Sequence, residues 1–230
     1  MATTLPAPRT IPQLRDGDRM DRDEFERRWD AMPDLKRAEL IEGVVYMAAA
    51  LSARHGEPHF SIQGWLFMYQ AQTPGVLGSD SASVRFDKRN MPQPDSLLAI
   101  KSECGGQSVI SADHYYEGGP ELIAEVANSS KSRDLGVKKT VYQRQGVREY
   151  IVWRTQDKAI DWFILRDGEY VLLGPGDDGI TRSEVFPGLW LDAAALISGN
   201  LARVLHVAQL GIASPEHAAF VLTLASFAAR

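Results

Sequence analysis

The chain reads GPELIAEVANSSKSRDLGVKKTVYQRQGVREYIVW over residues 119–153. Two apolar runs rich in β-formers, 122–127 and 150–153, predict strands within this stretch. Between them, apolar residues at helical spacing predict a helix over residues 133–145, which Gly146 would end. A strand, a helix and a second strand in this order predict a parallel crossover, and therefore an α/β fold.

Further regular elements are predicted on both sides of this unit. The stretch 40–47, with a Glu-Gly turn signal inside it, predicts a hairpin. A helix over residues 52–72 is predicted from an apolar face that includes Phe60. Additional strands are expected over residues 83–86, 95–100, 160–165 and 170–173.

The other segments have different patterns. The Gly/Ser-rich insertion 101–119 is expected to be a loop. Residues 1–20, which contain three prolines, are expected to form a poorly ordered arm, followed by a short surface helix. The apolar tail, 191–230, is expected to be mostly helical, with breaks at Gly199, Gly211 and Pro215.

Composition sets limits on the class of protein. The 230 residues are 44% hydrophobic and 24% charged, which is typical of one globular α/β domain with a full core. Cys104 is the lone cysteine, which excludes an intrachain disulfide framework and a multi-cysteine zinc site. The most apolar stretch, 218–229, is shorter than the roughly 20 residues that span a bilayer. We therefore expect a cytoplasmic protein without a membrane span.

Two carboxylates interrupt apolar strands in the middle of the chain. Asp95 alternates with Leu97 and Ala99, and Glu125 alternates with Ile123, so each acid shares a strand face with aliphatic residues. An ionised carboxylate there is costly unless a cation or hydrogen-bond donors compensate it. The pair therefore indicates a hard divalent metal, with Mg²⁺ first and Mn²⁺ as the alternative. The competing interpretation is a pair of strand-end acids that lie in water or pair with arginine.

The predicted crossover helix concentrates positive charge. The chain as a whole has a net charge of −5, whereas residues 131–148 contain six bases and one acid. Lys138 lies beside the apolar stripe of this helix and could reach the two carboxylates, although a solvated lysine is the competing interpretation. The other bases would contact a phosphodiester backbone, unless they form an ordinary solvated helix face. These candidate nucleic-acid contacts are Lys131, Arg133, Lys139 and Arg144.

Several motifs in this order resemble one known family. They are Glu39-Leu40-Ile41-Glu42-Gly43 followed by Met47 and His55, then Pro94-Asp95, then the motifs within 119–152, and finally Phe186-Pro187-Gly188-Leu189-Trp190-Leu191. As a set, they resemble the Uma-two family of endonucleases, which belongs to the PD-(D/E)XK, or restriction-endonuclease-like, superfamily. The resemblance extends from about residue 37 to residue 197.

The resemblance implies a role for each matching residue. Asp95 and Glu125 would hold Mg²⁺ or Mn²⁺, and Lys138 would be the active-site lysine. In the wider superfamily the lysine follows the glutamate by two positions, but Ala127 stands there in this chain. Lys138 would therefore be a lysine that has moved to the following helix. His55 and Glu39 match the family's histidine and amino-terminal acid and would complete the site.

The resemblance also implies an activity, metal-dependent hydrolysis of DNA, with RNA left open as the substrate. The alternative is a catalytically inactive relative that acts as a nucleic-acid or protein interaction module. A carboxylate-pair glycoside hydrolase is a third interpretation, which would need a sugar-sized cleft lined by aromatic residues.

His55 and His59 are four residues apart, which is a zinc-binding spacing on a helix. Pro58 favours a helix start near itself, which would take His55 off the helix and spoil this spacing.

The expected architecture is a restriction-endonuclease-like α/β fold: a mixed, twisted sheet flanked by helices, with a helical C-terminal extension. The expected divisions are an amino-terminal arm and short helix (1–36), the nuclease domain (37–197) and the extension (198–230). Apolar residues of the extension, such as Leu201 and Leu205, could pack on the protein's own core, on another protein or on a second copy. Homodimerisation is the preferred hypothesis, because two subunits would present two sites to two strands.

Overall fold

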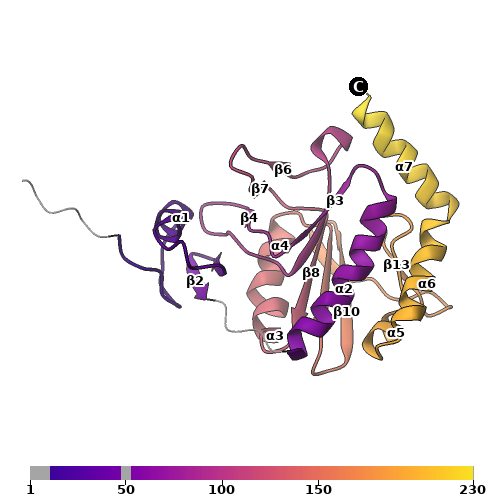
Figure 1. Cartoon of the computed structure of the whole chain (residues 1–230), viewed down its shortest axis with the longest axis horizontal. Helices are drawn as coiled ribbons and strands as arrows, with labels where there is room; N and C mark the ends of the chain where they lie inside the picture. Colours follow the sequence, from indigo (N-terminus) through magenta and orange to yellow (C-terminus); the bar gives the residue numbers. More distant parts are fainter. Residues whose placement is uncertain (1–10, 48–52, 230) are drawn as a thin grey trace, which may run out of the picture.

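The structure is a computed structural model that describes residues 11–47 and 53–229. Within these residues, the centre is a mixed sheet in which β8 and β9 are parallel and the other neighbouring strands are antiparallel (Figure 1). The strand order is β11 (Glu169–Leu172), β10 (Ala159–Arg166), β9 (Glu149–Arg154), β8 (Leu122–Ala127), β5 (Ser96–Ile100) and β3 (Val76–Asp80). The predicted α/β fold with a mixed sheet and flanking helices is confirmed.

The crossover between β8 and β9 is helical, as predicted, but it is not one regular helix. It consists of α3 (Lys131–Arg133), a wider π-type turn, η2 (Asp134–Lys138), and α4 (Lys139–Arg144). The interruption lies at Gly136, whose φ of −102° and ψ of −108° are not helical. Wide turns of this kind are frequent at functional sites, and this one carries two buried charged residues, Asp134 and Lys138.

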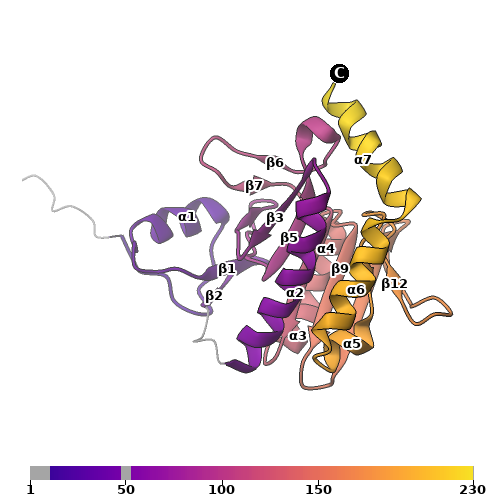
Figure 2. The ribbon, with the colours of Figure 1, turned by 45° about the vertical axis from the view of Figure 1, so that its right-hand side comes forward.

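The sheet separates two cores. One face is covered by α2 (Ala53–Gln72), α5 (Ala193–Ile197) and α6 (Leu201–Ile212), with α2 and α6 side by side in Figure 2. The crossover covers the other face, where Ile123 and Ala127 of β8 pack against α4. Because side chains along a strand alternate between faces, Glu125 also lies on the crossover side.

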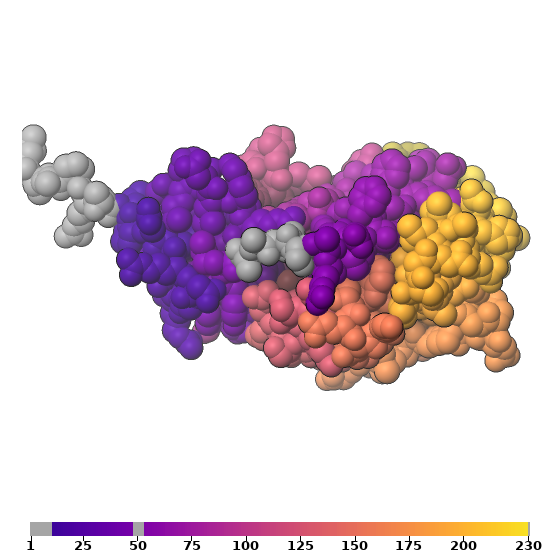
Figure 3. All heavy atoms as spheres, turned by 60° about the horizontal axis from the view of Figure 1, so that its bottom comes forward, coloured from indigo at the N-terminus to yellow at the C-terminus, as the bar shows by residue number. Residues whose placement is uncertain are grey.

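The amino-terminal segment forms a smaller unit at one end of the molecule, and the C-terminal helices lie at the other end (Figure 3). The amino-terminal unit contains α1 (Arg22–Asp30), β1 (Ala38–Ile41) and β2 (Val44–Met47). The predicted hairpin is therefore confirmed. Glu42 and Gly43 have φ values of 51° and 73°, as a tight two-residue hairpin turn requires. Phe25, Leu40 and Met91 form part of the small core beneath it.

The sequence pattern predicts a poorly ordered arm over residues 1–20, of which residues 1–10 lie outside the described residues. For residues 11–20 the expectation is wrong. Leu14 is buried in the small core beneath the hairpin, and the Gly17 N–H donates to the Val45 carbonyl at 2.8 Å. This strip of chain covers apolar surface that the two-stranded hairpin alone leaves open.

Helix α2 differs in two ways from the predicted pattern. Phe60 is 78% exposed, while the buried face is formed by Ile62, Trp65 and Tyr69. Pro58 lies inside the helix, five residues after its start, and not at the start itself. A proline so near the amino terminus removes only one of the first helical hydrogen bonds, which the packing of α2 on the sheet offsets.

Short elements that the sequence pattern did not predict complete the fold. The expected loop 101–119 contains η1 (Ser102–Cys104), β6 (Val109–Ile110) and β7 (Tyr116–Glu117), and β7 pairs with both β6 and β4 (Val84–Arg85). A second small hairpin joins β12 (Thr181–Arg182) to β13 (Trp190–Leu191). The edge strand β3 has the sequence VLGSD, which contains few β-formers.

The tail is helical, as expected, and comprises α5, α6 and α7 (Pro215–Ala228). It packs on the protein's own core through residues such as Val204, Ala208 and Leu224. Leu201 and Leu205 are each 42% exposed, so homodimerisation through this surface stays a prediction. Among the described helices, none alone is long and apolar enough to cross a membrane; α6 and α7 reach that length only as a pair bent by 61°.

The break expected at Gly211 lies two residues later, at residues 213–214, so Gly211 is the penultimate residue of α6. A Cβ atom there would stand 2.3 Å from the Gly188 carbonyl oxygen and 2.7 Å from the Trp190 ring. The glycine thus permits a close approach between α6 and the chain before β13.

We predict that Gly211→Ala lowers the free energy of unfolding by about 2 kcal/mol, because the added methyl group overpacks this contact. Urea unfolding checks this. The matched control is Gly64→Ala in α2, where a Cβ meets nothing within 4 Å and should leave stability unchanged or slightly raised. Equal stability of the two variants would show that α6 does not pack as described.

Candidate active site

A cavity of about 440 Å³ opens where the central sheet meets the β1–β2 hairpin, the start of α2 and the crossover. All five residues predicted to form the catalytic site line it. They are Glu39, His55, Asp95, Glu125 and Lys138. The structure therefore brings together side chains that are spread over 100 residues of sequence, and five separate segments of the chain contribute them.

Asp95 directly precedes β5 and lies on the crossover side of the sheet with Leu97. Its Oδ2 accepts a hydrogen bond of 2.8 Å from the backbone N–H of Val126, and its Oδ1 lies 3.5 Å from His55 Nε2. Burial alone would raise the pKa of Asp95, but His55 and the Val126 N–H outweigh burial and hold the pKa below its usual value. Asp95 is therefore an ionised carboxylate in the cavity.

Glu125 projects from β8 and is almost completely buried. Its Oε1 accepts a hydrogen bond of 2.8 Å from the Tyr142 hydroxyl and lies 2.6 Å from Lys138 Nζ. Burial raises the pKa of Glu125 to about 8; the positive charge of Lys138 opposes this shift, and the negative charge of Asp95 adds to it. The competing interpretation, in which the strand-end acid lies in water or pairs with arginine, is therefore wrong for Glu125, whose partners are a lysine and a tyrosine.

Lys138 is 2% exposed, which rules out the alternative of a solvated helix lysine. Its Nζ lies 2.8 Å from Glu39 Oε1 and 2.6 Å from Glu125 Oε1. Burial alone would lower the pKa of Lys138, but these two carboxylates outweigh burial and raise the pKa well above its usual value. The ammonium group is therefore charged and fixed between two strands of different sheets.

Glu39 and His55 line the cavity from two different elements, β1 and α2. Glu39 projects from β1, and its Oε1 also accepts a hydrogen bond of 2.9 Å from the Gln93 N–H. The Glu39 side chain is 13% exposed, so Glu39 is not a solvent-exposed hairpin acid. His55 is in the first turns of α2, and its buried Nε2 has no hydrogen-bond partner among the described residues. The negatively charged Asp95 raises the pKa of His55, although burial opposes this shift.

The sequence pattern missed two polar residues beside this cluster. Asp134 is buried and lines the cavity. It precedes Lys138 by four residues, and an acid and a base at this spacing on a helix predict that their side chains lie close together. Tyr142 lies at an apolar position of the helical pattern, and its ring packs in the core. No sequence signal showed that its hydroxyl would reach Glu125.

The candidate nucleic-acid contacts do not gather in the cavity, since Arg133 is the one residue of the four that lines it. Lys131 lies 2.5 Å from Asp157. Arg144 pairs with Glu42. The Lys139 ammonium lies 3.7 Å from the centre of the Phe163 ring. The positive charge of this segment is therefore partly neutralised by acids from distant parts of the chain, and the proposed contacts to nucleic acid stay predictions.

The donor set of the cavity fits a hard divalent cation. Its walls include the carboxylates of Glu39, Asp95, Glu125 and Asp134. Lys138 compensates part of this charge, yet the pKa of Glu125 is still raised, and Asp95 is one of the causes after burial. The four carboxylates outnumber the three cationic side chains of the cavity walls, Arg37, Arg133 and Lys138, and their oxygen donors suit Mg²⁺ or Mn²⁺. Asp95 and Glu125 are two residues that could hold such an ion.

Comparison with solved structures gives the same fold. The chain is similar to the crystal structure of "a putative nuclease belonging to DUF820" from Anabaena variabilis ATCC 29413, with a TM-score of 0.53 and 12% sequence identity. The likeness covers 77% of this chain and 99% of that chain. No curated protein matches the sequence.

Comparison with protein families is more specific. Residues 22–194 match the Uma2 family, whose description is "Putative restriction endonuclease". This match covers most of the chain, including the hairpin, the central sheet and every residue of the cavity described above. The family resemblance inferred from the motifs is thereby confirmed, and the chain belongs to the Uma2 family.

Proposed function

We propose that this protein is a metal-dependent endonuclease that hydrolyses phosphodiester bonds of DNA in the cavity around Lys138. The observation that carries the proposal is the burial of Lys138 between Glu125 and Glu39, beside Asp95. A buried ammonium among carboxylates is costly to a protein that uses it only for stability. Membership of the Uma2 family supports the nuclease class.

Each residue has a role that follows from its contacts. Asp95 and Glu125 would hold Mg²⁺ or Mn²⁺, which when bound supplies Lewis acidity and lowers the pKa of a coordinated water. Lys138 places a fixed positive charge where the scissile phosphate gains negative charge in the transition state. Glu39 and Tyr142 act as positioning residues, because they hold Lys138 and Glu125 in place. His55 stabilises the ionised form of Asp95.

The alternative function is that of an inactive interaction module. The pairing of Lys131 with Asp157 and of Arg144 with Glu42 favours it, because these ion pairs weaken a cationic surface that an enzyme could use to attract DNA. The alternative predicts no cleavage of any nucleic acid at any divalent-metal concentration.

We predict that Asp95→Asn lowers the rate of DNA cleavage by about 100-fold or more, because it removes a charged metal ligand and leaves the side-chain volume unchanged. Nicking of supercoiled plasmid in Mg²⁺ or Mn²⁺, with chelator as the blank, measures this rate. Asp177→Asn, at an exposed loop residue outside the cavity, is the matched control and should cleave like wild type. Cleavage by Asp95→Asn at the wild-type rate would place the reaction elsewhere, and inactive wild-type protein would favour the interaction module.

The raised pKa of Glu125 predicts a pH dependence of stability in the metal-free protein. Between pH 4.5 and about 8 the folded protein retains a proton on Glu125 that the unfolded chain releases. Unfolding therefore releases a proton, and the free energy of unfolding falls as pH rises through this window, by at most about 1.4 kcal/mol per pH unit.

Glu125→Gln should remove this contribution, because the amide resembles the protonated acid. Urea unfolding from pH 5 to pH 8 in chelator checks the prediction, with the exposed Glu117→Gln as control. The expected result is that Glu125→Gln gains stability relative to wild type as pH rises, while Glu117→Gln does not. A constant difference between Glu125→Gln and wild type would mean that Glu125 is ionised throughout.

A further inference from the structure

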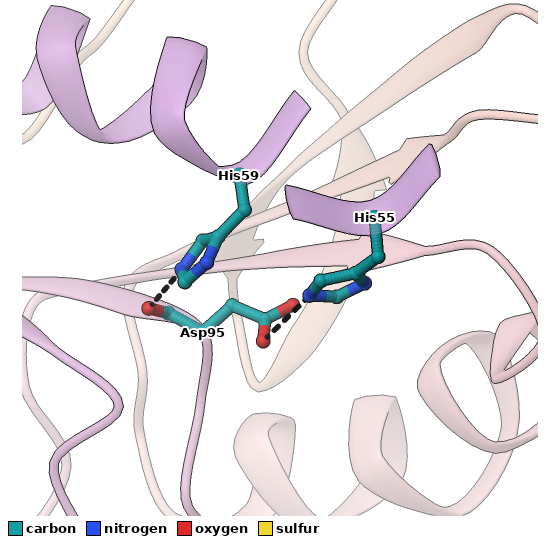
Figure 4. A group of neighbouring side chains, drawn as sticks. All are labelled: His55, His59 and Asp95. Carbon is teal, nitrogen blue, oxygen red and sulfur yellow. Dashed lines mark hydrogen bonds and ion pairs between the residues drawn. The ribbon is translucent and has the colours of Figure 1, made fainter. Parts of the chain in front are cut away.

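The first turns of α2 place two imidazoles beside Asp95. His55 and His59 are four residues apart in the same helix, so they lie on one face, and both rings flank Asp95 in Figure 4. Their ring centres are 5.5 Å apart. The expectation that Pro58 would take His55 off the helix is wrong, since both histidines are within α2. The four-residue spacing of the two histidines on one helix face is therefore intact.

The three side chains converge on one point. His55, His59 and Asp95 each offer one ligand atom, and these atoms lie within 4.8 Å of one another. Ligand atoms of one tetrahedral ion with bonds of about 2.1 Å lie about 3.4 Å apart. To bind one ion, the most distant ligand atoms have to move closer together by about 1.4 Å at most. Small side-chain rotations can produce this movement.

Two further contacts indicate a ligand at this point. His55 Nε2 is buried and makes no hydrogen bond to the described residues; its ion-pair partner, Asp95 Oδ1, lies 3.5 Å away, a distance that a shared metal ion can bridge. His59 Nε2 lies 2.8 Å from the Asp95 carbonyl oxygen and 3.5 Å from Asp80 Oδ1. Backbone carbonyls and carboxylates around an imidazole are the usual supports of a metal-binding histidine.

We propose that His55, His59 and Asp95 form a binding site for a first-row transition-metal ion of the Zn²⁺ or Co²⁺ type. Two imidazoles and one carboxylate favour such an ion over Mg²⁺, which prefers oxygen ligands. The three protein ligands leave a fourth position open to water or to a substrate oxygen. The site shares Asp95 with the proposed nuclease centre but uses neither Glu125 nor Lys138, so metal binding here does not depend on the proposed cleavage reaction.

Titration of the full chain with Co²⁺ in the absence of nucleic acid tests this site. Bound Co²⁺ should give visible absorption bands typical of a nitrogen and oxygen ligand set, and Zn²⁺ should abolish them by displacement. Mg²⁺ in large excess should not. Because this readout needs no catalysis, it separates the metal site from the proposed nuclease activity.

His59→Gln should weaken Co²⁺ binding by about 100-fold, since it removes one of three protein ligands. His55→Gln should have a similar effect, and thermal unfolding of both variants verifies that they remain folded. The matched control is His206→Gln, an exposed histidine of α6, which should bind Co²⁺ like wild type. Equal affinity of wild type and the folded His59→Gln protein, or the absence of Co²⁺ bands in wild type, would overturn the proposal.

Discussion

The burial of the Lys138 ammonium is the constraint on which the site depends. A buried charge must be paired, and the partners of Lys138 come from two other parts of the chain, Glu39 on the hairpin and Glu125 on the central sheet. Glu39 is 99 residues away in sequence. The same two contacts thus hold the hairpin against the sheet and set the position of the Lys138 charge. A change that breaks either contact should therefore alter both the stability of the fold and the geometry of the cavity.

The electrostatic balance around this lysine explains why the cavity is suited to a cation. Burial raises the pKa of Glu125, whereas donors and His55 keep Asp95 ionised, so the two acids differ in charge state although they share one cavity. Neighbouring carboxylates whose pKa values are shifted in opposite directions are typical of functional sites. Glu121 provides a contrast in the same strand segment: its two oxygens accept hydrogen bonds of 2.8 Å from the N–H groups of Ile100 and Gln107, which is a structural use of a buried acid.

The sequence predicts the features that depend on local pattern. The period of two in the strands predicted that Asp95 shares a face with Leu97 and that Glu125 shares a face with Ile123, and the strand–helix–strand order predicted the parallel crossover. Features that depend on contacts between distant segments could not be read in this way. The partners of Lys131 and Arg144 are such contacts, and so is the packing that keeps Pro58 inside α2. Tyr142 shows a further limit, because a core tyrosine and a tyrosine that binds Glu125 have the same sequence signal.

The central claim is that Asp95 and Glu125 hold a divalent ion beside Lys138. The most direct test is a crystal structure of the protein soaked in Mn²⁺, recorded with anomalous scattering. The account predicts an anomalous peak between the carboxylates of Asp95 and Glu125, with Lys138 Nζ still in contact with Glu125. Anomalous density that is absent from the cavity, or that lies only at His55 and His59, would contradict this account of the active site.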